Sequence, residues 1–301
     1  MTSSDDAKIG PALPITHRKR EAEDWALVLI AEGIPSQLFR TGGGFSLQVA
    51  PETQTTACEI LTDWQIERIE RARRFSLPIP RGATAVETAA AYLFALSLLP
   101  FHLGLEAAGR SSLFLEMGRS QAALVLDGQW WRLITALTLH ADLPHVVGNS
   151  LFGGFFLAAV AGRLGLGFAV AAFLVTGTLG NFANALYYES AHSSVGASTG
   201  VFGLVGVLAG LAAWQRHHSA LPGRGAWVAF AAGLGLVAML GSGGARVDFS
   251  AHLFGLAAGG LTGLLLAVPF AKPARPGRAK QGLATIIALA IVLTAWLRAL
   301  G

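Results

Sequence analysis

The sequence predicts an all-α polytopic membrane protein that is preceded by a small α+β soluble domain. Hydrophobic residues make up 53% of the 301 residues, and the mean hydropathy is +0.53. Charged residues make up only 13%, whereas about 25% is usual in a soluble protein. After residue 82 the chain becomes a series of long apolar runs, several of which approach the roughly 20 residues that a membrane-spanning helix needs.

The polar part before residue 82 predicts its own small fold. We expect residues 1–19 to be disordered and residues 20–75 to form an α-β-β-α domain. Glu21–Glu32 carries an apolar stripe at helical spacing. Thr41–Gly44 contains three glycines between two short strand-like runs, which is typical of a hairpin turn. Pro51–Arg74 is predicted to form the second helix.

Seven apolar runs are candidate spans. Six of them fall in residues 82–270, which we expect to form one helical bundle. A basic linker, residues 271–282, then leads to a last span in residues 283–301. The seven runs are Val86–Leu105, His145–Ala161, Gly165–Tyr187, Ala197–Trp214, Ala226–Gly241, Phe249–Phe270 and Leu283–Leu300.

Lysine and arginine placement predicts the orientation, because these residues accumulate in cytoplasmic loops. With the N-terminus inside, eleven of them fall in inside segments and five in outside segments. The N-terminal domain is therefore expected to be cytoplasmic, and seven spans place the C-terminus outside. We expect the bilayer to be a bacterial inner membrane.

Composition also argues against other classes of protein. The net charge of +4 fits loop topology, and no basic stretch is interleaved with aromatic residues as in nucleic-acid-binding proteins. The single cysteine, Cys58, cannot form an internal disulfide. The oligomeric state is not predicted by the sequence.

Ser198 opens the fourth predicted span and lies between Gly196 and Gly200. A nucleophile at a helix N-terminus has backbone N–H groups near it, and these groups can stabilise an oxyanion. Flanking glycines let a substrate backbone come close. The alternative is that serine and glycine here only allow close helix packing.

His252 lies within the sixth predicted span, where ionisable residues are rare and usually functional. It is a candidate general base, with a proton relay, an ion site or a buried structural histidine as alternatives. Two glycine strips favour close packing of the fourth and sixth spans, which would bring Ser198 toward His252. The strips are Gly203, Gly206, Gly210 and Gly255, Gly259, Gly263.

His145 and Asn149 are four residues apart at the start of the second predicted span, hence on one helical face. Such a pair can donate hydrogen bonds to a developing oxyanion. One alternative is a polar helix start. Another is a metal site formed by His140 and His145, which has no convincing third ligand in the sequence.

Depth in the membrane connects these three sites. The second, fourth and sixth spans run in the same direction, and Asn149, Ser198 and His252 all lie near their outer ends. The simplest chemistry is proton transfer from Ser198 to His252, with His145, Asn149 and the Ser198 N–H around the oxyanion. Asp248 is expected to be a solvated helix start, so a two-residue dyad is the minimal hypothesis.

Four groups of residues occur in a specific order: Trp131-Arg132, His145-x-x-x-Asn149, Gly196-x-Ser198, and Ala251-His252 followed by Gly255 and Gly259. Over residues 85–270 this ordered set resembles the rhomboid intramembrane serine proteases of bacteria. The resemblance implies a six-helix catalytic bundle with Ser198 as nucleophile, His252 as base, and His145 and Asn149 at the oxyanion. Gly196, Gly200, Trp131 and Arg132 would support them. It implies no metal, ATP or other cofactor, and single-span transmembrane proteins in the lipid bilayer as substrates.

Two positions depart from the family pattern. Thr199 follows the serine where many members have glycine, and Phe254 stands two residues after the histidine where many have glycine. Phe254 is expected to alter packing between the fourth and sixth spans. Two other functions are considered: a catalytically silent rhomboid-like protein that binds membrane clients, and a small-molecule transporter. The transporter is disfavoured because the spans carry no deep charges and form no matching halves.

Overall fold

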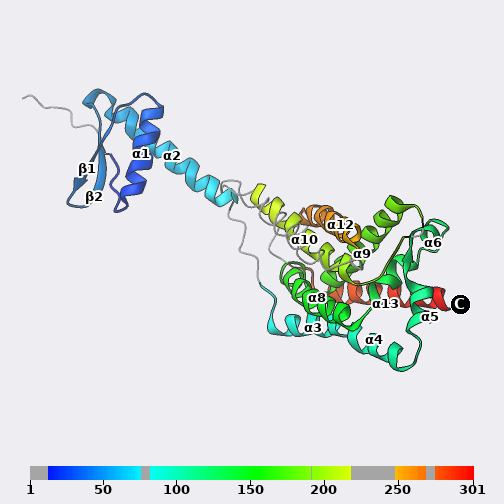
Figure 1. The fold of residues 1–301 in the computed structure, drawn as a ribbon. Helices are drawn as coiled ribbons and strands as arrows, with labels where there is room; N and C mark the ends of the chain where they lie inside the picture. Colours follow the sequence, from blue (N-terminus) through cyan, green and yellow to red (C-terminus); the bar gives the residue numbers. More distant parts are fainter. Residues whose placement is uncertain (1–12, 76–81, 191, 218–247, 269–274) are drawn as a thin grey trace, which may run out of the picture. The chain divides into compact units, whose positions relative to one another are not determined.

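A computed structural model describes residues 13–75, 82–190, 192–217, 248–268 and 275–301. The chain divides into two compact units, with the boundary after Ser76. The first unit is a small α+β fold, and the second is a bundle of helices (Figure 1).

The first unit packs two helices and a β-hairpin around an apolar core. The hairpin is antiparallel and pairs Gln37 with Gln48 and Thr41 with Gly44. Trp25, Leu29 and Leu61 form the centre of the core. The elements are α1 (Lys19–Ala31), β1 (Gln37–Thr41), β2 (Gly44–Gln48), the 3-10 turn Pro51–Thr53 and α2 (Gln54–Phe75).

This unit begins earlier in the chain than the sequence analysis expected. Thr16 forms a β-bridge with Phe45, and Leu13 is buried in the core. Gly44 has a φ of +138°, and a Cβ at this position would collide with the carbonyl of Thr16. Residues 13–18 are therefore ordered against the hairpin, because glycine at position 44 lets the two backbones touch.

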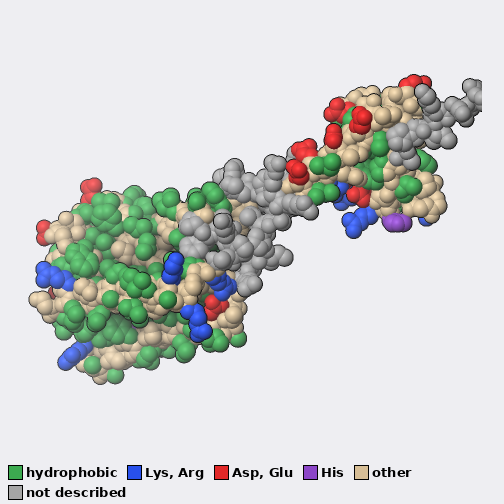
Figure 2. Space-filling model, turned by 180° about the vertical axis from the view of Figure 1, so that it is seen from behind, with side chains coloured by type: hydrophobic (Ala, Val, Ile, Leu, Met, Phe, Trp, Pro, Cys, Tyr) green, Lys and Arg blue, Asp and Glu red, His purple; other side chains and the backbone are tan. Residues whose placement is uncertain are grey.

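The second unit contains six helical segments that are long and apolar enough to cross a membrane, among the residues that the structure describes. This agrees with the predicted fold class, and Figure 2 shows hydrophobic side chains spread over much of the visible surface of this unit. The fifth predicted span, residues 226–241, lies outside the described residues. The segments are Ala85–Ala107, which comprises α3 (Ala85–Leu96) and α4 (Leu98–Ala107), α8 (Leu143–Leu164), α9 (Leu166–Tyr188), α10 (Ser198–His217), α12 (Phe249–Ala267) and α13 (Arg278–Leu300).

The first span is interrupted at Ser97, between α3 and α4. Pro100 lies three residues further on and has no N–H to donate to the carbonyl of Leu96, and its ring crowds that carbonyl. The Ser97 hydroxyl instead donates to the Phe94 carbonyl at 2.6 Å. The proline thus accounts for a break that hydropathy alone did not predict.

The segment between α4 and α8 has regular secondary structure of its own. It contains α5 (Ser111–Gly118), β3 (Ser120–Gln121), α6 (Ala122–Leu126), α7 (Arg132–Thr135) and a 3-10 turn (Ala136–Thr138). β3 pairs with β4 (Ser193–Ser194), which lies between α9 and α10. The strand pair thereby ties this segment to the stretch of chain that leads into Ser198.

Helices α10 and α12 lie side by side (Figure 1) and form the most extensive contact among the described helices. A Cβ on Gly259 would collide with the carbonyl oxygen of Gly203, and one on Gly206 with that of Leu256. The two predicted glycine strips therefore meet backbone to backbone. Thr199 is accommodated because Gly180 of α9 faces its methyl group and Gly255 faces its carbonyl.

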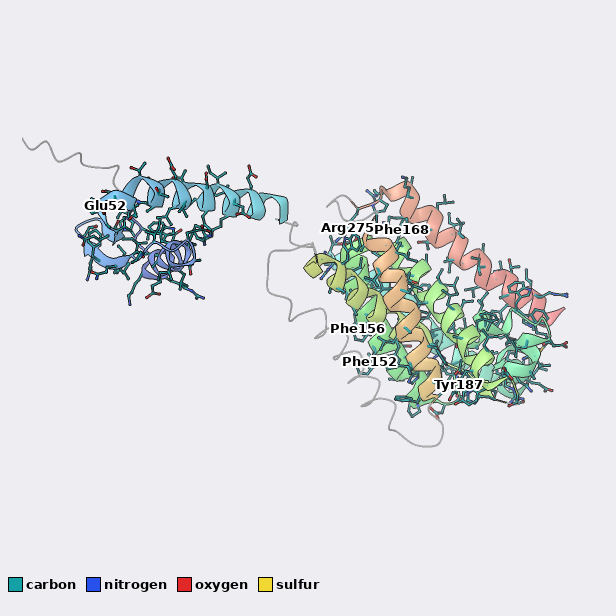
Figure 3. All side chains as sticks on the ribbon, turned by 90° about the horizontal axis from the view of Figure 1, so that it is seen from above. Glu52, Phe152, Phe156, Phe168, Tyr187 and Arg275 are labelled. Carbon is teal, nitrogen blue, oxygen red and sulfur yellow. The ribbon has the colours of Figure 1, made fainter. Side chains whose placement is uncertain are left out.

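Phe254 does not lie in this seam, contrary to the expectation from the sequence. Its ring packs on Tyr187 of α9, with 5.8 Å between ring centroids. Gly255 and Gly259 occupy the helix face toward α10, so Phe254 points toward α9 and leaves the α10–α12 contact unchanged. Tyr187 lies at the end of the bundle opposite to Arg275 and Phe168 (Figure 3).

α13 begins at Arg278, whereas the sequence analysis expected the span to begin at residue 283. Hydrogen bonds of Arg275 and Gln281 hold the start of α13 against α3 and the turn between α8 and α9. Arg275 donates to both carboxylate oxygens of Glu87 in α3, at 2.8 and 3.1 Å, and to the carbonyl of Gly162. Gln281 donates to the Leu164 carbonyl at 2.8 Å and accepts from the Phe168 N–H at 3.2 Å. These bonds fix the last span to the turn between α8 and α9.

Candidate active site

Ser198 is the first residue of α10, and the two residues before it are held tightly. Gly196 has a φ of +126°, a conformation that residues with a side chain rarely adopt. Its N–H donates to the Ala136 carbonyl at 2.9 Å. The turn therefore presents a half-buried Ser198 at a helix N-terminus, where backbone N–H groups lack intrahelical partners.

His252 lies in the first turn of α12, and its Nε2 is 2.9 Å from the Ser198 Oγ. The ring is buried and lies against Phe202, with 4.5 Å between centroids and 31° between planes. Its Nδ1 has no hydrogen-bond partner among the described residues. Serine and histidine are thus at hydrogen-bonding distance, with no carboxylate from the described part of the chain on the imidazole.

His145 and Asn149 point at the same turn from α8. A Cβ built on Gly196 would lie 2.7 Å from His145 Nε2 and 3.4 Å from Asn149 Nδ2. The Asn149 amide is buried, and its Nδ2 has no hydrogen-bond partner within the described chain. Two side-chain nitrogens of α8, His145 Nε2 and Asn149 Nδ2, therefore flank the backbone that leads into Ser198. Asp142 fixes the helix start by accepting from the His145 backbone N–H at 2.9 Å.

His140, which precedes the His145-x-x-x-Asn149 motif, contacts the same turn. Its Nε2 accepts from the Ala197 N–H at 3.4 Å, so it contacts the residue before Ser198. Burial, together with the nearby charges of His145 and His102, lowers the pKa of His140 to about 3. A neutral imidazole at this position can accept a hydrogen bond, whereas a protonated one cannot.

This pKa makes the stability of the protein depend on pH. In the unfolded chain histidine has a pKa of about 6.5, so between that value and about 3 only the unfolded chain binds the proton. We expect the contribution of His140 to the free energy of unfolding to fall as the pH drops below about 6.5, by at most about 1.4 kcal/mol per pH unit. Thermal unfolding in detergent between about pH 7 and pH 4 measures this, and His140→Gln should unfold with a shallower pH dependence. Parallel curves for the parent and His140→Gln would contradict the role given to His140.

Comparisons with known proteins show the family of the chain. Residues 127–269 match the family model of the rhomboid domain. The putative rhomboid protease YdcA of Bacillus subtilis is 30% identical over 141 residues, which cover 47% of this chain and 69% of YdcA. The chain belongs to the rhomboid family.

Longer rhomboid proteins are matched over part of their length. The rhomboid protease GluP of Bacillus subtilis is 31% identical over 205 residues, which cover 66% of this chain and 39% of GluP. Rhomboid-like protease 1 of Toxoplasma gondii is 30% identical over 97 residues, about a third of each protein. This chain therefore spans about two fifths of GluP.

In this rhomboid the structure brings Ser198, His252, His145, Asn149 and Gly196 together. The other three residues singled out in the sequence lie elsewhere. Gly200 faces Phe173 of α9, whose ring leaves no room for a Cβ. Trp131 packs against Trp130 and lies under the guanidinium of Arg298. Arg132 donates to Gln129 and to the carbonyls of Glu116 and Arg119, so it holds the segment between α4 and α8 in shape.

Two buried amides of the rhomboid bundle were missed in the sequence. Asn181 Nδ2 donates to the Leu133 carbonyl at 2.9 Å, and Asn184 Nδ2 donates to the Asp248 carboxylate at 2.8 Å. Both lie in α9 and are three residues apart, so they share a face. Polar residues inside a membrane span are energetically costly and usually have a role. A search of the predicted spans for polar residues would therefore have found both asparagines.

The alternative of a metal site at His140 and His145 finds no third ligand in the structure, because the described residues contain no group of three or more potential metal ligands.

A cavity of about 160 Å³ adjoins the site. Asn149 and Ala197 line it near Ser198, and the remaining lining is almost entirely apolar. Ala288, Leu289 and Val292 of α13 form one of its walls. The last span therefore contributes to the surroundings of the site although it carries no candidate catalytic residue.

Proposed function

We propose that this rhomboid is a serine endopeptidase that cleaves single-span transmembrane proteins near the outer face of the bilayer. Ser198 is the nucleophile and His252 the general base. The observation that carries the proposal is the 2.9 Å distance between the Ser198 Oγ and the His252 Nε2. The curated relatives named as proteases support the class of reaction.

The reaction follows from these two groups. With its proton on Nδ1, the His252 imidazole accepts the Ser198 hydroxyl proton on Nε2 while the Oγ attacks the substrate carbonyl. The imidazolium then returns the proton to the leaving amine, and an acyl-enzyme remains. A water molecule, deprotonated by His252, hydrolyses the acyl-enzyme and restores the serine. We propose no metal, ATP or other cofactor for any step.

The oxyanion is held by His145, Asn149 and the backbone N–H of Ser198. The buried and unpartnered Nδ2 of Asn149 supports this role, since an unsatisfied buried donor is costly unless a ligand uses it. The His145 ring approaches the same turn. Donors fixed in a low-dielectric site stabilise developing charge without reorganising.

The substrate backbone must be locally unwound at the cut. Carbonyls inside a helix are already hydrogen-bonded and are shielded by the helix, so the scissile carbonyl lies in a helix-destabilising stretch. The apolar cavity beside Asn149 and Ala197 is suited to an apolar side chain next to that carbonyl. The family membership and the apolar spans support a reaction in a membrane.

The orientation that we propose puts the N-terminus in the cytoplasm and the C-terminus outside a bacterial inner membrane. The excess of lysine and arginine in the segments assigned to the inside supports it. Residues 13–75 then belong to a cytoplasmic domain, residues 82–270 to the catalytic bundle, 271–277 to a cytoplasmic linker and 278–301 to a seventh span.

A cleavage assay with Asn149→Ala tests the oxyanion assignment. We expect kcat to fall by about 10²- to 10³-fold, because one fixed donor to the oxyanion is lost. The assay uses protein reconstituted into liposomes with a tagged single-span substrate. Gly148→Ala is the matched control, since a Cβ there meets open space on the same helix. Equal kcat values for Asn149→Ala and the control would remove Asn149 from the mechanism.

The silent rhomboid-like protein remains the second candidate. It requires that Ser198 and His252 meet without activating the serine. Binding of a single-span protein with no cleavage product, by folded parent protein in the same liposomes, would favour it.

A further inference from the structure

His192 and Asp248 link the two segments that carry the dyad. His192 lies between α9 and α10, six residues before Ser198, and Asp248 is the N-cap residue of α12, four residues before His252. The His192 Nε2–H donates to the Asp248 Oδ2 at 2.7 Å. One hydrogen bond to a carboxylate therefore joins the segment that leads to Ser198 with the start of the helix that carries His252.

Each oxygen of the Asp248 carboxylate accepts two hydrogen bonds. Oδ1 accepts from the Ser250 hydroxyl at 2.7 Å and from the Ala251 N–H at 3.1 Å. Oδ2 accepts from Asn184 Nδ2 at 2.8 Å as well as from His192. The side chain is only 14% exposed. Asp248 is therefore not the solvated helix start that the sequence suggested.

Burial alone would raise the pKa of Asp248, but the hydrogen bonds from His192, Ala251 and Ser250 outweigh it and hold the pKa below its usual value. The carboxylate is therefore charged at neutral pH. A charged acceptor makes each of these bonds stronger than a bond between neutral groups.

His192 is held on its other sides as well. Its ring stacks on Tyr188 at the end of α9, with 3.8 Å between centroids and 15° between planes. Its backbone carbonyl accepts from the Ala122 N–H at 2.9 Å. The Tyr188 hydroxyl lies 3.1 Å from the Ser250 hydroxyl, whose proton is donated to Asp248. The network thus connects α6, the end of α9 and the start of α12 around His192.

No second hydrogen bond from the described residues orients the imidazole of His252. Its Nδ1 has no hydrogen-bond partner among them, while its Nε2 lies at Ser198 and its ring lies against Phe202. We propose that His192 and Asp248 are positioning residues that set the distance between Ser198 and His252, an inference that rests on the proposed protease function. Neither residue touches the reacting atoms.

Removal of the pair tests this inference. In full-length protein in detergent, His192→Ala and Asp248→Asn should each lower the rate of Ser198 labelling by a fluorophosphonate probe, and kcat for cleavage, by up to roughly 100-fold. KM should stay unchanged, because the substrate contacts remain. Asn is as good an N-cap as Asp, so Asp248→Asn keeps the helix start while it loses the charged acceptor.

Two further variants distinguish a positioning role from an effect on stability alone. His192→Gln still offers an N–H donor to Asp248 and should recover most of the labelling rate that His192→Ala loses. The double variant His192→Ala/Asp248→Asn should be no slower than the worse single variant, because the two residues act through one contact. Gln281→Ala is the control for destabilisation, because it removes the hydrogen bonds of Gln281 that hold the start of α13 at the other end of the bundle. This variant should have a lower unfolding temperature and an unchanged labelling rate.

Three results would overturn the inference. Folded His192→Ala and Asp248→Asn proteins that label within roughly threefold of the parent would show that the pair acts only on stability. Strictly additive losses in the double variant would show that the two residues do not act together. Parent protein that neither labels nor cleaves would remove the proposed function and, with it, this inference, whereas an active parent with unaffected variants removes the inference alone.

Discussion

Ser198→Ala and His252→Ala should each lower kcat for substrate cleavage by roughly 10⁴- to 10⁶-fold. The serine oxygen is the atom that forms the acyl-enzyme, and the imidazole 2.9 Å away is the only described group in hydrogen-bonding reach of it that can take its proton. Because the two groups act as one unit, the double variant should be no worse than either single variant. The measurement is product formation from a tagged single-span protein in liposomes.

Ser150→Ala is a matched control for the serine change. Ser150 is a buried serine of α8, and its hydroxyl has no partner among the described residues. It should retain activity and fold normally. Cleavage by the Ser198→Ala variant at the parent rate would end the assignment of the nucleophile.

Gly259→Val should impair both folding and cleavage. A Cβ at Gly259 collides with the Gly203 carbonyl oxygen, so valine forces α10 and α12 apart. Overpacking of this kind costs about 1–3 kcal/mol or more. A shift of about 1 Å between Ser198 and His252 is expected to lower kcat by roughly 100-fold. Thermal unfolding in detergent and cleavage in liposomes measure the two effects.

Gly282→Val is the matched control, because a Cβ at Gly282 in α13 meets open space. It introduces the same side chain into a spanning helix without a backbone collision. If Gly259→Val unfolded at the parent temperature and cleaved at the parent rate, the two helices would not be packed through their glycines.

The meeting of the two glycine strips could be predicted from the sequence because their cause is local. Gly255, Gly259 and Gly263 repeat every four residues and so lie on one face of a helix. A face without side chains in a membrane helix is usually an interface. The structure places the carbonyls of Thr199, Gly203 and Val207 on that face.

The candidate site could be predicted through depth. Asn149, Ser198 and His252 lie near the starts of spans that run in the same direction, so they were expected at one level. The common depth of these residues stays a prediction. The catalytic roles remain proposals, and the described geometry supports them through the Ser198–His252 distance and the open Asn149 donor.

Other features depended on contacts between distant segments. Asp248 and His192 are 56 residues apart, and no periodicity relates a loop residue to a helix cap. Asp248 therefore seemed to be solvated. The prediction that Phe254 alters the α10–α12 contact was wrong for a similar reason. The sequence does not say whether a bulky side chain of α12 faces α9 or α10, and in the structure Phe254 packs on Tyr187 of α9.

Labelling of detergent-purified protein with a fluorophosphonate probe tests the central claim most directly, because the probe reacts only with an activated serine and needs no known substrate. We expect the parent protein to be labelled and Ser198→Ala and His252→Ala to remain unlabelled while both stay folded. Labelling of Ser198→Ala at the parent rate, or no labelling of well-folded parent protein, would contradict an activated Ser198–His252 dyad.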